Sequence, residues 1–187
     1  MPDKTKLLLH ACCAPCGTLP IRLLQMEFDV TVFFYNPNIH PQTEWRLRLE
    51  EMRSLTSRWN ISFSYVDSGT EEWFQRMHGL EGEPEGGSRC ESCYRMRLEA
   101  TAQKAFQMGC PKFATTLTLS PHKKAEIINR IGLDSAARFG VVFYTADFKK
   151  KDGFRIAGQI VRDEGLYRQN YCGCIYSRKR LVLGCVS

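Results

Sequence analysis

The stretch LLLHACCAPCG, residues 7–17, joins an apolar run to three closely spaced cysteines. A short apolar run of this kind is typical of a strand buried on both faces. We therefore predict a strand over residues 6–12. Pro15 and Gly17 predict that the strand enters a loop, which carries Cys12, Cys13 and Cys16.

Strands and helices are predicted to alternate along the rest of the chain. Further strands are expected within 29–38, stopping at Asn36–Pro37, at 61–67, within 111–120 and at 140–148. Helices are expected at 18–28, 40–60, 70–80, 90–109, 121–139, 155–166 and shortly after 174. This alternation predicts an α/β fold with a mainly parallel sheet of about five strands and helices on both faces. No stretch has the composition of a linker, so residues 1–187 are expected to form one domain.

The bulk composition is that of an ordinary globular protein. The chain has 187 residues, of which 43% are hydrophobic and 25% charged, and its net charge is +6. The N-terminal apolar run is too short for a signal peptide or a membrane span, so we expect a cytoplasmic protein without a membrane partner. The positive charge is compatible with a polyanionic partner but does not establish one.

Seven of the nine cysteines fall into three groups. Cys90 and Cys93 repeat the C-x-x-C spacing of Cys13 and Cys16, and Cys172 and Cys174 flank Gly173, which permits a tight turn. In a reducing compartment such groups indicate metal ligands or redox pairs rather than structural disulfides. Cys110 and Cys185 stand alone and are expected to be inert.

Two further expectations follow from these groups. The N-terminus of the helix at 90–109, together with Arg89, is predicted to favour thiolates at Cys90 and Cys93. Because one zinc ion or one iron–sulfur cluster usually takes four ligands, seven thiols indicate a second centre or a redox pair beside the first.

Five segments closely resemble, in order, the signatures of the QueH-type epoxyqueuosine reductases: LLLHACCAPC, CESCYRMRL, SPHKK, DFKKKDGF and YRQNYCGCIYS. The resemblance spans residues 7–177. It implies a Rossmann-like fold of the adenine nucleotide hydrolase-like type and the last step of queuosine biosynthesis. In that step the epoxide of epoxyqueuosine, at the wobble position of a tRNA anticodon, is deoxygenated by two electrons without cobalamin.

The resemblance also implies a [4Fe–4S] cluster and an additional mononuclear iron, with electrons from an external donor. The implied metal ligands are Cys12, Cys13, Cys16, Cys90, Cys93, Cys172, Cys174 and Asp147. Cys12, Cys13 and Asp147 are the implied catalytic residues; Asp147 either holds the lone iron or protonates the departing oxygen. The division of cysteines between cluster and lone iron is left open.

Contacts with tRNA are expected from residues on predicted loops and at a predicted helix start. The candidates are Tyr35, Asn36, Ser120, His122, Lys123, Lys149, Lys150, Arg155, Tyr167 and Arg168. Ser120, His122 and Lys123 are expected at a helix N-terminus, which favours phosphate, although Ser120 could equally be an ordinary N-cap. Tyrosines can stack on unpaired bases. His10 is expected to be a core histidine, and His40 a solvent-exposed loop histidine.

Two other functions remain open on the sequence alone. One is a non-enzymatic, zinc-stabilised RNA-binding protein, which would leave three thiols without a role. The other is a thiol–disulfide oxidoreductase using Cys13 and Cys16, which would leave the other two cysteine groups without one.

Overall fold

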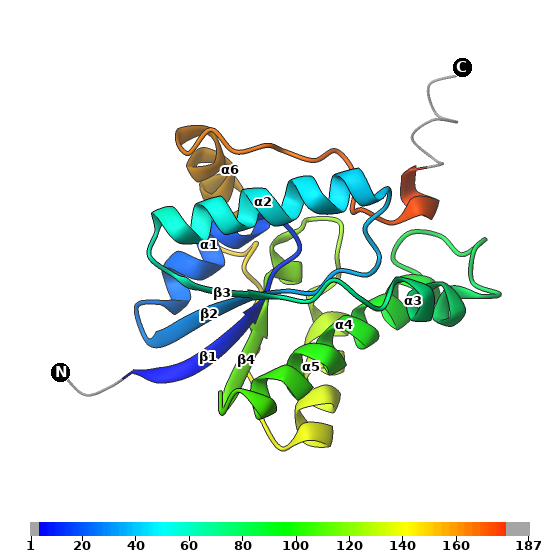
Figure 1. The fold of residues 1–187 in the computed structure, drawn as a ribbon, viewed down its shortest axis with the longest axis horizontal. Helices are drawn as coiled ribbons and strands as arrows, with labels where there is room; N and C mark the ends of the chain where they lie inside the picture. The colour runs from blue at the N-terminus through cyan, green and yellow to red at the C-terminus, as the bar shows by residue number, and fades with distance from the viewer. Residues whose placement is uncertain (1–3, 179–187) are drawn as a thin grey trace.

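The computed structural model describes residues 4–178, which form an α/β fold around one parallel sheet (Figure 1). The strands are β1 (Thr5–His10), β2 (Phe28–Phe34), β3 (Ser62–Tyr65), β4 (Lys112–Thr115) and β5 (Val142–Phe143). All pair in parallel, in the order β3-β2-β1-β4-β5. The predicted fold class is thus confirmed.

Helices cover both faces of this sheet. They are α1 (Ala14–Leu24), α2 (Gln42–Arg58), α3 (Thr70–Met77), α4 (Ser88–Gln107), α5 (Ala125–Phe139) and α6 (Gly153–Asp163). In Figure 1, α1, α2 and α6 lie on one side of the strands, and α3, α4 and α5 on the other. Among the residues that the structure describes, no helix is long and apolar enough to cross a bilayer.

The apolar run that precedes the first cysteines forms the centre of the sheet. Leu7 and Leu9 pack in the cluster beneath α1, α2 and α6, whereas Leu8 packs in the cluster beneath α3, α4 and α5. All three are fully buried. Since successive side chains of a strand point to opposite faces, one apolar run fills both layers of the core.

The strand order reverses between β1 and β4. In open parallel sheets such a reversal leaves a crevice beyond the carboxyl ends of the two strands, where ligands bind. The loop after β1 carries Cys12 and Cys13, and the chain after β4 leads to Ser120, so both enter this crevice.

Several predicted boundaries were wrong. Helix α1 begins at Ala14, so Cys16 lies in its first turn instead of in a loop. The chain leaves β4 at Thr115 for a short 3₁₀ helix (η1, Thr116–Leu119), because the Thr115 hydroxyl accepts a hydrogen bond from the Leu117 amide and turns the backbone. Strand β5 has only two residues.

The predicted helix start at residue 121 is also wrong. Helix α5 begins at Ala125 with Lys124 as its N-cap, so Ser120 is not an N-cap and SPHKK does not form a helix N-terminus. Pro121 follows Ser120, the C-cap of η1, and disfavours a helical conformation at Ser120, which is extended, with ψ 129°. Residues 175–178 are helical, as expected for the last short helix.

Candidate metal centre and substrate cavity

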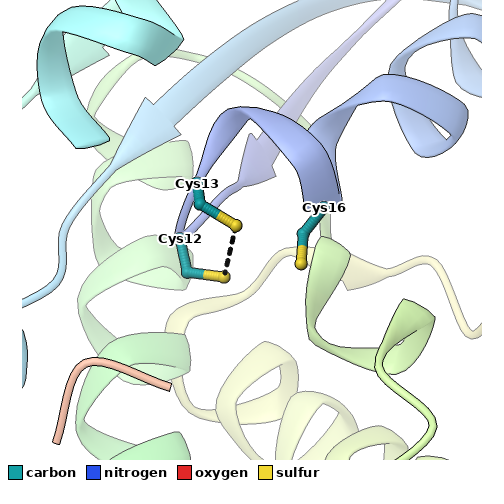
Figure 2. A group of neighbouring side chains, drawn as sticks. All are labelled: Cys12, Cys13 and Cys16. Carbon is teal, nitrogen blue, oxygen red and sulfur yellow. Dashed lines mark hydrogen bonds between the residues drawn. The ribbon is translucent and has the colours of Figure 1, made fainter. Parts of the chain in front are cut away.

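Three thiols meet where β1 passes into α1 (Figure 2). The sulfur atoms of Cys12, Cys13 and Cys16 all lie within 4.8 Å of one another. Cys13 is the N-cap of α1 with an extended backbone, and a proline stands in the first two helical positions, where its fixed φ suits a helix start. The strand–helix turn therefore converges three soft donors on one point.

A buried polar chain fixes this turn from behind. Asn36 donates a 2.9 Å hydrogen bond to the Ala11 carbonyl and accepts a 2.7 Å bond from Arg97. The Tyr35 ring stacks on Phe33, and both Tyr35 and Asn36 are buried. Tyr35 and Asn36 were predicted to contact tRNA. Among the described residues, neither belongs to the lining of the cavity that the next paragraph describes. The structure places them behind the cysteines.

A cavity of about 450 Å³ brings the three cysteine groups together. Its lining includes Cys12, Cys16, Cys90, Cys93, Cys172 and Cys174. Cys13 is not part of the lining, but its sulfur accepts a 2.7 Å hydrogen bond from Gln169, a lining residue. Segments separated by about 160 positions in the sequence thus supply thiols to one site.

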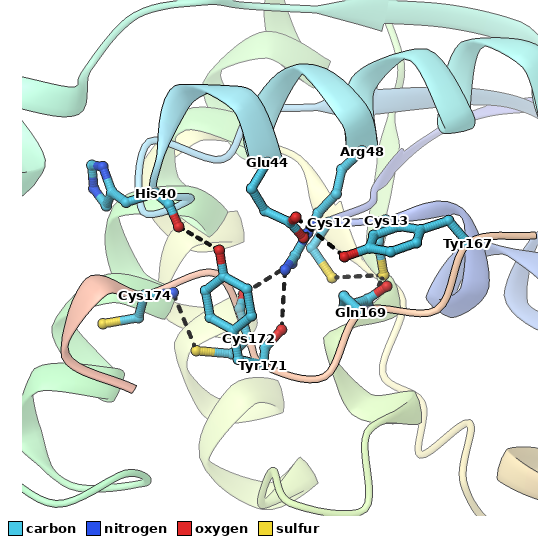
Figure 3. A network of polar contacts seen from close by, with 10 residues as sticks. All are labelled: Cys12, Cys13, His40, Glu44, Arg48, Tyr167, Gln169, Tyr171, Cys172 and Cys174. Atoms are coloured by element: carbon cyan, nitrogen blue, oxygen red, sulfur yellow. Dashed lines mark hydrogen bonds and ion pairs between the residues drawn. The ribbon is translucent and has the colours of Figure 1, made fainter. Parts of the chain in front are cut away.

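The last two thiols reach the cavity on a segment docked against α2, which we call the C-terminal strap (residues 167–174; Figure 3). The Arg48 side chain, 1% exposed, donates to the carbonyls of Tyr171 and Cys172 at 3.1 and 3.2 Å. It also forms a 2.7 Å ion pair with Glu44 and lies over the Tyr171 ring. Arg48 therefore anchors the backbone that positions Cys172.

The strap is also tied to the loop after β2. The Tyr171 hydroxyl donates to the His40 carbonyl, and the His40 amide donates to the Gly173 carbonyl at 2.8 Å. The Tyr167 hydroxyl donates to Glu44 at 3.2 Å. Figure 3 shows the contacts of Tyr171 with His40 and of Tyr167 with Glu44 along the strap.

Proton sharing separates the pKa values of the thiols within the first cysteine group. Hydrogen bonds with Cys13 and Cys16, aided by Arg97 and Lys123, hold the pKa of Cys12 well below its usual value. Burial, reinforced by the bond to Cys12, raises the pKa of Cys13 to about 12. The pKa of Cys16 is raised chiefly by its hydrogen bonds to the other two sulfurs. One thiolate is therefore shared by two protonated neighbours.

The group on the strap shows the same division. Hydrogen bonding with Cys174, Lys123 nearby and the Ser177 hydroxyl lower the pKa of Cys172 to about 5. The bond to Cys172 and burial raise the pKa of Cys174. Burial alone would lower the pKa of Lys123, but the nearby Cys172, Cys12 and Cys16 raise it overall. A cation inside the cavity thus compensates thiolates from two groups.

The expectation that Arg89 and the start of α4 would favour thiolates at Cys90 was wrong. Burial raises the pKa of Cys90 and outweighs the lowering effects of the Gly86 amide and Arg89. Arg89 is buried and donates to the carbonyls of Leu80, Glu81 and Glu83. Its guanidinium thus organises the loop before α4.

The other predicted site residues divide into two sets. Ser120, His122, Lys123 and Arg168 line the cavity. Asp147, Lys149, Lys150, Arg155 and Tyr167 lie outside its lining, as far as the described residues define it. Asp147 is half-buried and forms a 2.9 Å ion pair with Lys149, whose ammonium also donates to the Lys123 carbonyl at 3.3 Å. Asp147 is therefore linked to the cavity wall through Lys149.

His10 and His40 are both packed among other side chains. His10 is fully buried beside the Thr115 hydroxyl and the Tyr35 carbonyl, as expected for a core histidine, and burial lowers its pKa to about 3. His40 is not the exposed loop residue predicted, because its ring packs on Trp73 and Phe74. Burial lowers the pKa of His40.

Of the two lone cysteines, Cys110 does not line the cavity. Cys110 is buried in the core cluster beneath α4 and α5, and burial raises its pKa. Cys185 lies outside the described residues.

Sequence reasoning missed Arg48 and Gln169. For Arg48 a signal existed: it lies three residues from Trp45 and next to Leu49, on the apolar face of α2, where a charge needs a partner. No pattern pointed to Gln169, because its bond to Cys13 depends on how the strap docks.

Comparisons with known proteins identify the family. The model of the family described as epoxyqueuosine reductase QueH matches residues 7–180. Epoxyqueuosine reductase QueH of Streptococcus pyogenes serotype M1 is 39% identical, covering 94% of this chain and 71% of that protein. The Acinetobacter baylyi protein of the same name is 41% identical, over 95% and 83% of the two chains.

Solved structures of other proteins share the fold. One, described as a predicted subunit of a tRNA methyltransferase from Methanocaldococcus jannaschii, has a TM-score of 0.59 at 9% identity, over 89% of this chain and 93% of that one. The U34-tRNA thiolase NcsA from Methanococcus maripaludis, solved with its [4Fe–4S] cluster, has a TM-score of 0.58 at 11% identity, over 94% and 62%. Similarity at this identity shows the fold alone. The match over nearly the whole sequence, by contrast, places this chain in the QueH family of epoxyqueuosine reductases, which are oxidoreductases in tRNA modification.

Proposed function

We propose that the chain, acting as one catalytic domain, deoxygenates epoxyqueuosine in tRNA with iron held by its cysteines and electrons from an external donor. The observation that carries the iron part is that six thiols from three segments line one cavity, with the Cys13 thiol beside those of Cys12 and Cys16. Soft thiolate donors suit iron–sulfur clusters and iron, so the donor set fits. The thiolase with the same fold carries a [4Fe–4S] cluster, so the fold can accommodate one.

The arrangement also supports a division of the ligands. Cys90, Cys93, Cys172 and Cys174 provide the four thiols that a cluster usually takes. Cys12, Cys13 and Cys16 converge in a separate turn and would hold the lone iron. We assign the first four to the cluster and the other three to the mononuclear iron.

The reaction breaks both C–O bonds of the epoxide, forms the alkene, and consumes two electrons and two protons to release one water. When bound, the iron centres would supply single electrons and a Lewis acid that polarises a C–O bond. The chain itself holds cationic Arg97 and Lys123 beside the thiolates, which limits the negative charge of the site.

Asp147 is proposed as a further iron ligand or as the proton source for the departing oxygen. Its support is the link through Lys149 to Lys123 on the cavity wall. Asp147→Asn should lower turnover strongly, with the exposed Asp152→Asn as control. Near-normal turnover with full iron content would remove Asp147 from the chemistry.

Metal analysis of anaerobically purified protein tests the assignment. Wild type should contain more than four irons and about four acid-labile sulfides per chain, as the proposed cluster and lone iron require. Cys90→Ala should lose the sulfide and most of the iron, whereas Cys12→Ala should keep the sulfide and lose only the extra iron. Cys110→Ala, outside the cavity, is the matched control and should keep both.

The same analysis separates the alternatives. Zinc alone, with no labile sulfide even after anaerobic reconstitution, would contradict the iron proposal and favour a structural zinc protein. Loaded wild type that converts epoxyqueuosine tRNA to queuosine tRNA with a chemical one-electron reductant would support it. Loaded protein without turnover would contradict the proposed reaction.

A further inference from the structure

The wall of the cavity formed by α6 ends in an exposed aromatic ring. Phe154, Ala157, Gly158 and Val161 line the cavity from this helix. Ala157 and Val161 are buried, but Phe154 is 42% exposed. An aromatic ring of this size left half in water at the mouth of a cavity has surface available for a ligand.

The backbone that precedes Phe154 is tightly packed against the turn before α6. A Cβ atom at Gly153 would lie 1.8 Å from the Phe148 carbonyl oxygen, so α6 starts in close contact with the preceding turn. Gly153 is buried and Phe154 is the second residue of the helix. The backbone that carries Phe154 is therefore held in place by a packed helix start.

A guanidinium lies over this ring. The Arg168 side chain sits 5.7 Å from the centroid of Phe154, and both residues line the cavity. Among the described residues, Arg168 forms no ion pair with a carboxylate, which leaves its charge and the side of the guanidinium turned away from Phe154 available. A phenyl ring and a guanidinium are the two groups on which proteins stack unpaired bases.

The surroundings favour a polyanion over an apolar ligand. Lys150 and Lys151, in the turn before α6, and Arg155 are exposed. His122 and Lys123 line the cavity, where Glu85 is the acidic residue of the lining. Basic residues around an aromatic platform are the arrangement that binds single-stranded nucleic acid.

We propose that Phe154 and Arg168 form a stacking subsite for an unpaired nucleobase that neighbours the modified nucleoside in the substrate RNA. The inference rests on the proposed function, because it takes tRNA as the substrate of this cavity. Since the modified base must be turned into the cavity to reach the thiols, its neighbour in the anticodon loop is left at the mouth. The subsite would hold that neighbour and so orient the loop.

The test measures binding of a fluorescently labelled anticodon stem-loop RNA to the metal-loaded protein. Phe154→Ala should weaken binding roughly tenfold or more, the size expected for losing one base–aromatic stack. Because no charge is removed, the salt dependence of binding should not change. Phe154→Tyr, which keeps the ring, should bind within about twofold of wild type.

Two further variants keep the inference falsifiable if Phe154→Ala folds poorly. Arg168→Lys retains the charge but loses the planar face, so it should weaken binding while leaving the salt dependence unchanged. Phe106→Ala removes another exposed phenylalanine, 65% exposed at the far end of α4, and should bind as wild type does. Equal binding by Phe154→Ala and wild type, or an equal loss in Phe106→Ala, would overturn the subsite.

A fully paired RNA hairpin without an open loop distinguishes stacking from general charge attraction. Phe154→Ala should not alter the weak binding of that hairpin, and an equal effect on both RNAs would overturn the inference. Failure of the proposed function has a different signature: loop binding would depend on Phe154, but wild type would not reduce epoxyqueuosine tRNA.

Discussion

At the scale of single residues, Gly173 sets the direction of the two thiols on the strap. Its φ is 104°, a conformation that side chains disfavour, and a Cβ atom would lie 2.8 Å from the Ile39 Cγ1 and 3.3 Å from the Ile39 Cα. Gly173→Ala should therefore lower the free energy of unfolding by about 1–3 kcal/mol from backbone strain, with the clash added. Denaturant unfolding of the metal-free, reduced protein measures this.

Gly165→Ala is the matched control for that substitution. Gly165 also has a positive φ, 62°, but an added Cβ would meet nothing within 4 Å. The Gly165→Ala variant reports the cost of backbone strain without a clash, so its free energy of unfolding should fall less than that of Gly173→Ala. Equal losses would show that Ile39 does not constrain the cysteine turn.

Residue patterns predicted the thiols of the site better than the contacts that orient them. The cysteine groups were found because their spacing is a local property of the sequence. The roles of Arg48 and Gln169 depend on contacts across more than 120 positions, and spacing along the chain carries no information about them. His40 was misjudged for the same reason, because α3 folds against its ring.

At the scale of elements, long periodic helices were predicted well and short irregular segments poorly. The pattern of buried residues in α2 is fixed by its own sequence, whereas β5 is shortened to two residues and η1 interrupts the chain after β4. After β4, the buried Thr115 hydroxyl accepts a hydrogen bond from the nearby Leu117 amide, and this bond competes with strand pairing. Local propensity does not reveal which of the two forms.

The docking of the strap on α2 depends on one guanidinium. Arg48→Gln would remove the Glu44 ion pair and the charged donors to the Tyr171 and Cys172 carbonyls. Hydrogen bonds from a charged group contribute about 1.5–3 kcal/mol each, so hydrogen exchange in peptides covering residues 167–174 should accelerate roughly tenfold or more. Mass spectrometry of the metal-free protein measures this without relying on activity.

Arg46→Gln is the control on the same helix, because Arg46 is exposed and does not line the cavity. Exchange in the strap should not change in this variant. If Arg48→Gln matched it, the strap would be held by Tyr171 and the His40 backbone instead, and Arg48 would stabilise α2 alone.

At the scale of the whole molecule, the sheet joins distant segments at one edge. β1 and β4 lie side by side, so the cysteines after β1, the start of α4 and the strap converge beyond the strand ends. The parallel sheet with helices on both faces was predictable from the alternation of strands and helices, but the order of its strands was not predicted. Of the three cysteine groups, only the first could be placed at this edge from the sequence, because it directly follows a central strand.

The net charge of +6 is useful to a tRNA enzyme only where it gathers near the cavity. The turn before α6 places exposed Lys150 and Lys151 beside the helix that lines the cavity wall, whereas Lys104 lies near the end of α4, close to the start of β4.

Affinity for tRNA should therefore fall steeply as salt rises, with a logarithmic slope set by the number of phosphates contacted. Lys150→Gln should reduce that slope by about 0.7–0.9, the contribution of one phosphate contact, while Lys104→Gln should leave it unchanged. Filter binding across a series of potassium chloride concentrations gives both slopes. An equal reduction in the two variants would mean that the charge acts as a diffuse field, and that tRNA is positioned by contacts inside the cavity instead of by this turn.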